Sequence, residues 1–236
     1  MSIAENIKNI RAQMAAAAIA AGRDPKSILL CAATKCNDAD AVRQAIAAGV
    51  DCCGENRAQE LTAKLREDAY RGAPVHFIGR LQTNKVKQVV GKVDLIQSVD
   101  RLGLLEAIHK EAARQGIVQD ILLEVNVGRE EAKGGFFPEE LPALLENIAH
   151  FANIRVRGLM TVPPICQKDT DNDKFFQEIY DIGVDIMAKK YDNVLVECLS
   201  MGMSDDFEDA VSCGSTMIRV GTAIFGARDY TRLHQK

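Results

Sequence analysis

Short apolar runs alternate with longer stretches of helical periodicity along almost the whole chain. The apolar runs, which we predict to be strands, cover 28–33, 51–53, 75–78, 94–98, 121–127, 156–160, 194–199 and 217–220. The helical patterns between them cover 38–48, 56–70, 82–91, 101–115, 138–152, 172–190 and 205–213. A further helix precedes the first strand: Ile3, Ile7, Ile10 and Met14 follow one another at three- and four-residue steps, and Gly22 ends the pattern.

This alternation predicts an α/β fold. Eight β/α units in 236 residues fit a TIM (β/α)8 barrel. A Rossmann-like open sheet more often has roughly five to seven strands and a switch point, so we prefer the barrel. No linker or internal repeat interrupts the pattern, and we expect residues 1–236 to form a single barrel domain with an extra N-terminal helix. The polar, proline-containing segment 163–173 is predicted to be a loop.

Composition narrows the possible partners. With 47% hydrophobic and 26% charged residues, the chain can build a core, and disorder is excluded. A net charge of −4 offers no basic surface for nucleic acid or an anionic membrane, which leaves small soluble ligands. The longest apolar run, 14–21, is far shorter than the roughly 20 residues that cross a bilayer.

The location of the protein is predicted from its first residues and its cysteines. The N-terminus lacks the basic and apolar regions of a signal peptide, so we expect a cytoplasmic protein. The seven cysteines are odd in number and form no CxxC pair. They are therefore interpreted as reduced, mostly buried thiols, with neither a disulfide framework nor a metal site.

Candidate chemistry is sought where strands end, because the carboxyl ends of barrel strands form the active-site face. Lys35 follows the first strand directly. A lysine held there is partly desolvated, which lowers its pKa and frees the amine for Schiff-base formation with a carbonyl compound. The alternative is an ordinary surface lysine at a strand end.

A phosphate site is predicted near the last two strands. Gly221 permits close approach of the backbone, Thr222 supplies a hydroxyl group, and Ser200 and Ser204 after the seventh strand can add two more. Each of these residues is also compatible with a cap or turn. The glycine spacing of 221–226 lacks the Lys-Ser/Thr of a P-loop, so an NTPase is rejected, and the HExxH and GxSxG motifs are absent.

A reactive lysine and a phosphate site on one face indicate pyridoxal 5′-phosphate, because its aldehyde can react with the lysine while its phosphate binds at the second site. Arg219, two residues before Gly221, is then expected to face the ring nitrogen. A guanidinium group there disfavours protonation of the pyridine ring and weakens it as an electron sink. An arginine in a structural ion pair is the competing interpretation.

At this point the chain resembles the YggS/PROSC family of pyridoxal 5′-phosphate homeostasis proteins over residues 7–230. The resemblance is carried by Thr34-Lys35, GENRAQE (54–60), HFIG and LQTNK (76–85), RGLM (157–160), LSMGMSDD (199–206) and GSTMIRVGT (214–222). It implies a barrel like the N-terminal domain of alanine racemase. It also implies that Lys35 is the Schiff-base lysine and that Arg219 lies near the pyridine nitrogen. The remaining implied cofactor ligands are Ser200, Gly221 and Thr222 at the phosphate, with Asn56 and Ser204 nearby.

The resemblance favours a carrier over an enzyme. Racemisation needs an acid or base on each face of the substrate, and in related racemases one of these is implied to be a tyrosine from a second, β-rich domain. This chain ends at Lys236 with no such domain, and its tyrosines (70, 180, 191 and 230) are not placed for that role.

We therefore predict a monomeric protein without catalytic residues. It binds and buffers pyridoxal 5′-phosphate and delivers it to apoenzymes that depend on this cofactor. A slow amino-acid racemase is the first alternative, and a class I aldolase-type lyase that uses Lys35 without cofactor is the second.

Two further motifs receive structural interpretations. His76 lies inside a predicted strand and is expected to be a hydrogen-bonded core residue. Lys85, Lys87 and Lys92 are expected on a solvated helix face, and Asn84-Lys85 is assigned no role.

Overall fold

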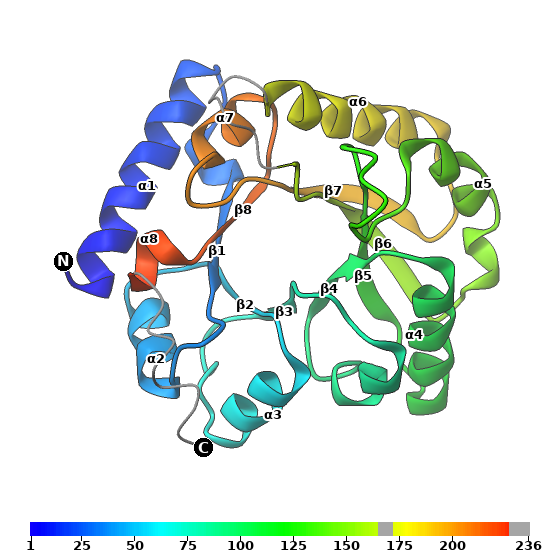
Figure 1. The fold of residues 1–236 in the computed structure, drawn as a ribbon, viewed down its shortest axis with the longest axis horizontal. Coiled ribbons are helices and arrows are strands. Elements are labelled where there is room, and N and C mark those ends of the chain that lie inside the picture. The colour runs from blue at the N-terminus through cyan, green and yellow to red at the C-terminus, as the bar shows by residue number, and fades with distance from the viewer. Residues whose placement is uncertain (165–171, 227–236) are drawn as a thin grey trace.

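Eight parallel strands close into a barrel in a computed structural model that describes residues 1–164 and 172–226 (Figure 1). The strands are β1 (Leu29–Ala33), β2 (Cys52–Glu55), β3 (Val75–Phe77), β4 (Leu95–Val99), β5 (Gln119–Glu124), β6 (Ile154–Met160), β7 (Val194–Ser200) and β8 (Met217–Val220). Each strand pairs with the next, and β8 pairs with β1. The predicted TIM barrel is confirmed. Most of the predicted loop 163–173 lies outside the described residues.

Helices surround the barrel. They are α1 (Ile3–Ala20), α2 (Ala39–Ala47), α3 (Ala58–Arg66), α4 (Leu102–Gln115), α5 (Leu141–Glu146), α6 (Asp173–Lys189), α7 (Phe207–Ser212) and α8 (Thr222–Phe225). The 3₁₀ helices are η1 (Pro25–Ser27), η2 (Thr83–Gln88), η3 (Pro138–Glu140) and η4 (Ile148–His150). None of the helices in the described part of the chain is long and apolar enough to span a membrane.

The extra N-terminal helix forms as predicted. Ser2 and Glu5 make a reciprocal capping box that satisfies backbone N–H groups at the start of α1. The buried face of α1 includes Ile7, Ile10 and Met14, and the helix packs against α7, α8 and α2 (Figure 1). This helix therefore covers the barrel where its first and last strands meet.

Two predicted helices differ from the structure. The segment 82–91 contains the 3₁₀ helix η2, which has no side-chain cap at its N-terminus and includes β-branched Val86. Neither feature stabilises an α-helix, so the segment adopts the shorter 3₁₀ form instead. The segment 138–152 is divided by Asn147, whose backbone leaves helical geometry. The four-residue α8 was not predicted, because so short a helix has no period to detect.

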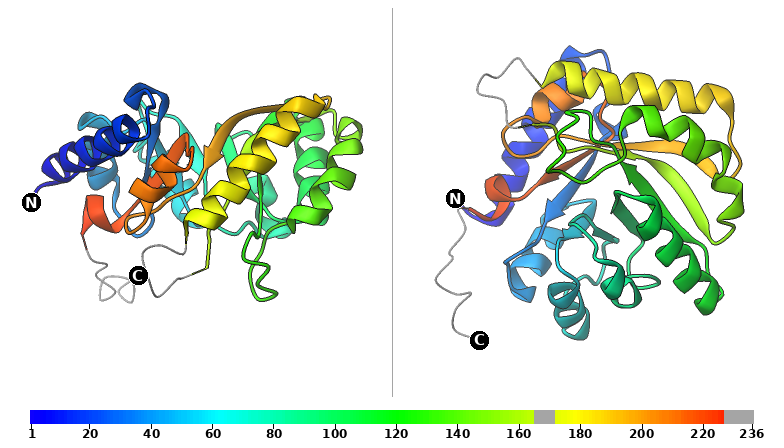
Figure 2. Two further views of the ribbon diagram at one scale, coloured as in Figure 1. Left: turned by 90° about the horizontal axis from the view of Figure 1, so that it is seen from above. Right: turned by 45° about the vertical axis from the view of Figure 1, so that its right-hand side comes forward.

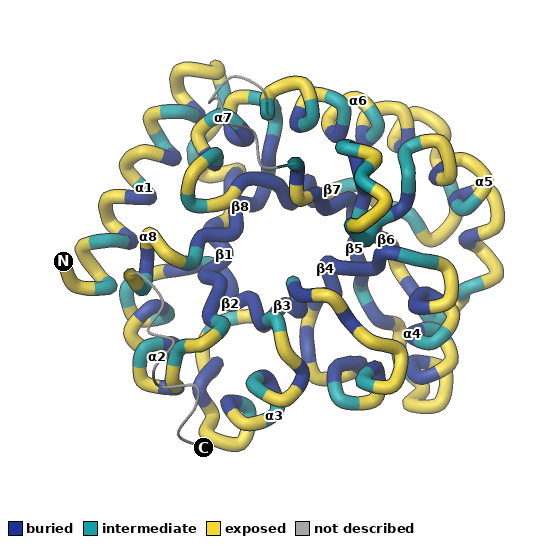
Figure 3. Tube along the Cα trace, in the orientation of Figure 1, coloured by how far each residue is buried: buried dark blue, intermediate teal, exposed yellow. Residues whose placement is uncertain are grey.

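Apolar side chains form an outer core between strands and helices and a smaller inner core inside the barrel. Figure 3 shows the strands as a buried ring inside largely exposed helix surfaces. The inner core consists of Cys31, Cys52, Leu95, Leu122, Met160, Cys198 and Met217. All six described cysteines are free thiols, and four of them are buried, while Cys36 is exposed and Cys213 is half-buried.

The residues after the strands gather at one end of the barrel. Figure 2 shows that α8, which follows β8, and the loop after β5 extend from the same side of the sheet. This is the end at which the predicted site residues lie, since they all follow strands or end them.

Candidate functional site

A cavity of about 1090 Å³ opens at the carboxyl ends of β1, β2 and β8. This is the size of a small-molecule site. Six of the seven predicted site residues line it: Lys35, Asn56, Ser204, Arg219, Gly221 and Thr222. Ser200 does not, because its side chain is buried.

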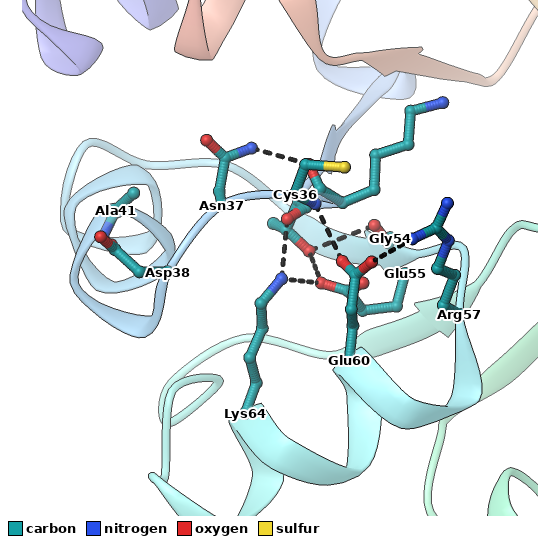
Figure 4. Close-up of polar contacts among 11 residues, drawn as sticks. Cys36, Asn37, Asp38, Ala41, Gly54, Glu55, Arg57, Glu60 and Lys64 are labelled. Atoms are coloured by element: carbon teal, nitrogen blue, oxygen red, sulfur yellow. Dashed lines mark hydrogen bonds and ion pairs between the residues drawn. The ribbon is translucent and has the colours of Figure 1, made fainter. Parts of the chain in front are cut away.

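Lys35 reaches this cavity from a tightly held turn after β1. Cys36 adopts the left-handed conformation, with φ of 63°, which is uncommon for a residue other than glycine. Its backbone N–H donates to Glu60 Oε2 at 2.8 Å, and Asn37 Nδ2 donates to the Lys35 carbonyl oxygen at 3.0 Å (Figure 4). The backbone around Lys35 is therefore fixed on both sides.

A buried ion pair lies beneath this turn. Glu55 at the end of β2 is fully buried, and its Oε1 atom pairs with Lys64 of α3 (Figure 4). Lys64 Nζ also donates to the Thr34 carbonyl oxygen at 2.7 Å, and Thr34 Oγ1 donates to Glu55 Oε1 at 2.5 Å. The carboxylate thus joins the ends of β1 and β2 to α3.

Sequence reasoning missed the role of Lys64. The available signal was its position: Ala58, Leu61 and Lys64 recur every three residues on the buried face of α3. A lysine in an otherwise apolar helix stripe requires a buried acceptor, which Glu55 and Thr34 provide.

Arg219 is also buried, but neutral oxygens hold it. It is 5% exposed, and its guanidinium group donates to Ser200 Oγ at 2.7 Å and to the Thr161 carbonyl oxygen at 2.8 Å. No carboxylate forms an ion pair with Arg219 within the described ranges, so the competing interpretation of a structural ion pair is wrong there. Burial lowers the pKa of Arg219.

Ser200 belongs to a chain of polar groups that crosses the barrel interior. Its hydroxyl donates to Gln97 Oε1 at 2.7 Å, and Gln97 Nε2 lies 2.9 Å from His76 Nδ1. Burial lowers the pKa of His76 to about 4, which keeps the imidazole neutral near pH 7. The predicted hydrogen-bonded core histidine is confirmed.

An acidic group near Arg219 titrates close to neutrality. Burial and the neighbouring charge of Asp100 together raise the pKa of Glu124 to about 7, while Arg219 opposes the shift. The charge of Glu124 near Arg219 therefore changes within the physiological pH range.

The turn after β8 carries two of the residues that were predicted to bind phosphate. Gly221 precedes α8, and Thr222 is the first residue of that helix. The Ala223 N–H donates to Ser204 Oγ at 3.4 Å, which joins the loop after β7 to this turn. The Ile224 and Phe225 N–H groups donate to the Gly221 carbonyl oxygen, both at 2.9 Å, which closes the turn.

Asn56 lines the cavity from the other side. Its Oδ1 atom is buried and has no hydrogen-bond partner in the described part of the chain. A Cβ atom at Gly79 would lie 2.3 Å from the Asn56 carbonyl oxygen, so only glycine lets the end of β3 approach this residue. The cavity wall therefore presents one unsatisfied acceptor.

The tyrosines and the potential metal ligands lie elsewhere. Of the four tyrosines, Tyr230 lies outside the described residues, and none of the other three lines the cavity. Among described residues, Cys31, Cys52 and His76 hold potential ligand atoms within 4.8 Å of one another inside the barrel. A hydrogen bond with Cys31, together with burial, raises the pKa of Cys52 and disfavours the thiolate that a metal requires.

Comparison with known proteins first defines the class. The family model for the alanine racemase N-terminal domain matches residues 2–229, so the chain is an alanine racemase-like β/α barrel. An alanine racemase from Clostridium difficile 630 shares this fold with a TM-score of 0.68 at 16% identity, covering 85% of this chain and 52% of the racemase chain.

Closer relatives define the group within that class. A pyridoxal phosphate homeostasis protein of Aquifex aeolicus is 41% identical over 230 residues, which are 98% of this chain and 100% of the relative. The solved structure of PipY from Synechococcus elongatus PCC7942 with PLP bound has a TM-score of 0.82 at 32% identity, covering 95% of this chain and 100% of PipY. The chain belongs to the family of pyridoxal phosphate homeostasis proteins.

Proposed function

We propose that this protein binds pyridoxal 5′-phosphate at Lys35 and acts in the homeostasis of that cofactor by storing and delivering it. The observation that carries the proposal is the convergence of Lys35, Arg219 and Thr222 on one cavity, from strands that lie at opposite ends of the sequence. The relative whose structure contains PLP, matched over 95% of this chain, supports the choice of ligand.

The residues present suit the cofactor. The cavity offers an amine at Lys35, a turn with a hydroxyl at Gly221-Thr222, and a buried cation at Arg219. When bound, the cofactor supplies an aldehyde that links reversibly to an amine. The unsatisfied Asn56 Oδ1 supplies an acceptor that a hydroxyl group on the ligand can satisfy.

Each residue has a distinct proposed role. Lys35 holds the aldehyde carbon, and the turn at Gly221-Thr222 with Ser204 holds the phosphate. Arg219 faces the ring nitrogen and keeps it unprotonated, because two positive charges at contact distance are unfavourable in a buried site. Ser200 was predicted at the phosphate, and we propose that it reaches the cofactor indirectly, by orienting the guanidinium group of Arg219 at 2.7 Å.

The proposal is for a carrier without turnover. An unprotonated ring is a weak electron sink, and none of the described tyrosines lines the cavity to serve as a second acid or base. We further propose that residues 1–236 act as one monomeric, cytoplasmic unit that delivers the cofactor to apoenzymes. The free thiols of the described cysteines support a reducing compartment.

The test is the absorbance spectrum of purified protein with one equivalent of pyridoxal 5′-phosphate, before and after borohydride. Wild type and Lys87→Ala, which changes an exposed lysine away from the cavity, should give a bound-cofactor band near the visible edge that borohydride fixes covalently. Lys35→Ala should give neither.

Three outcomes would contradict the proposal. An unchanged band in Lys35→Ala would remove the central residue. A wild-type protein that stays colourless and cleaves a carbonyl substrate would favour the aldolase alternative. Turnover of an amino acid at a rate above that of the free cofactor would favour the racemase function over the carrier function.

A further inference from the structure

A second cavity of about 720 Å³ lies beside the first, at the ends of β2, β3 and β4 and along η2. Its wall includes residues 80–85, which contain the Asn84-Lys85 pair that sequence analysis left without a role. Asn56 lines both cavities. A ligand in the second cavity would therefore lie next to the occupant of the first.

Positive charge dominates this second cavity. Its cationic side chains are Arg57, Arg80, Lys85 and Arg101, and no acidic side chain lines it. Carboxylates outside the lining compensate in part: Asp100 pairs with Arg101 and lies 3.8 Å from Arg80, and Glu60 lies 3.6 Å from Arg57. Lys85 is absent from the ion pairs formed within the described residues. A local excess of positive charge on a chain of net charge −4 attracts anions.

Two of the cations differ in exposure. Arg101 is held by Asp100 and donates to the Leu81 carbonyl oxygen at 3.2 Å. The Arg80 side chain lies 3.8 Å from the same carboxylate but is 76% exposed, so a ligand in the cavity can reach it. Two guanidinium groups are suited to bind two oxygens of a phosphate or carboxylate.

Neutral groups complete the lining. Gln82, Thr83 and Asn84 add amide and hydroxyl donors, and buried Phe77 and Leu81 add apolar contact surface. A volume of about 720 Å³ fits a small molecule.

We infer that this second cavity is an oxyanion site, which binds a small molecule carrying phosphate or carboxylate groups beside the cofactor cavity. Anion binding stands on the charges and shape of the second cavity alone. Only its relation to the cofactor rests on the proposed function. The site gives the 80–85 segment a role distinct from the cofactor ligands.

The experiment uses protein in which the cofactor has been fixed to Lys35 by borohydride and the excess removed, so that the first phosphate site is filled. Inorganic phosphate, pyrophosphate and citrate are titrated by calorimetry at constant ionic strength. Lys85→Ala and Arg80→Gln each remove one cation from the cavity. Lys87→Ala is the matched control, since it removes the same charge from the same 3₁₀ helix but does not line the cavity.

We expect one equivalent of pyrophosphate or citrate to bind, with about tenfold weaker binding in Lys85→Ala and Arg80→Gln and less than about twofold change in Lys87→Ala. Preference between the two probes identifies a phosphate-bearing or a carboxylate-bearing ligand. No binding at millimolar concentration, or equal losses in Lys85→Ala and Lys87→Ala, would overturn the inference.

The two proposals fail separately. If borohydride fixes no cofactor to Lys35, the proposed function fails, and the same titrations are made on unmodified protein. A difference between Lys85→Ala and Lys87→Ala there would still support the oxyanion site, and its absence would still overturn it.

Discussion

Two cations, Lys64 and Arg219, are buried at the same end of the barrel, but they have different kinds of partner. Lys64 forms an ion pair with the fully buried carboxylate of Glu55. Among the residues that the structure describes, Arg219 has only the Ser200 hydroxyl and the Thr161 carbonyl oxygen as hydrogen-bond partners. Both sites lie at strand ends and both are shielded from solvent, so the difference lies in the partner alone.

The difference separates support from function. A cation with its own carboxylate has its charge compensated within the protein, and it serves to join elements. The charge of a cation that is held by neutral oxygens is not compensated by a carboxylate, so its positive electrostatic potential remains available to a ligand. Lys64 therefore supports the turn that carries Lys35, and Arg219, in the function proposed above, is available to the ring of a bound cofactor.

The largest effect is expected from Glu55→Leu, which leaves Lys64 buried without its carboxylate. The free energy of unfolding should fall by about 3 to 5 kcal/mol. Denaturant unfolding measures this loss. The double variant Glu55→Leu/Lys64→Met should recover most of it, because an apolar pair removes the uncompensated charge. A loss below about 1 kcal/mol in the single variant would show that the ion pair does not join β1, β2 and α3.

Arg219→Met should give the opposite response. It removes a buried cation without orphaning a carboxylate, so the free energy of unfolding should change by less than about 1 kcal/mol. Affinity for pyridoxal 5′-phosphate should fall about tenfold to a hundredfold, since a charge-assisted contact is lost. Unfolding and equilibrium dialysis on the same preparation separate the two. A large loss of stability with unchanged affinity would reverse the comparison.

Glu124→Gln removes the acidic neighbour whose field reaches Arg219. Because the pKa of Glu124 is raised from 4.5 to about 7, the folded protein retains a proton that the unfolded chain loses between these values. The wild type is stabilised by this group at acid pH and loses that contribution as pH rises through 7.

The glutamine variant cannot ionise. It should therefore exceed the wild type in stability at pH 8 by about 3 kcal/mol and match it below pH 4.5. Unfolding curves across this pH range test the sign. A variant that is less stable than the wild type at pH 8 would contradict a buried, reluctantly ionised carboxyl group.

The smallest effect is expected from Ser200→Ala, about severalfold in cofactor affinity. If Ser200 acts by orienting Arg219, the substitution should cause no further loss in the Arg219→Met background. If it instead contacts the phosphate directly, the loss should be the same in both backgrounds. Dialysis with all three variants decides between these roles.

The fold was largely predictable because strands of a parallel barrel are buried on both faces and appear as short apolar runs. The β8 segment 217–220 was predicted with the bounds that the structure has, and β2 was predicted too short because Gly54 and Glu55 look like loop residues. The 3₁₀ geometry of 83–88 was not predictable, because its hydrophobic pattern resembles an ordinary helix turn.

The cavity was predictable only in part. Lys35, Gly221 and Thr222 follow strands directly, and parallel topology brings strand ends together. The topology does not predict which side chains pair with one another. Glu55 of β2 pairs with Lys64 of α3, and the Ser200 hydroxyl points inward, where it contacts Gln97 and Arg219. The second cavity joins residues from three strand ends, and no short motif in the sequence marks it.

The pairing of β8 with β1 has a consequence for the newly made chain. Lys35 precedes Gly221 and Thr222 by most of the sequence, yet Cys31 and Arg219 are register partners on adjacent strands. A chain in which β8 has not yet paired with β1 lacks the barrel seam beside this cavity. A ligand that binds only the closed barrel therefore stabilises this pairing by mass action.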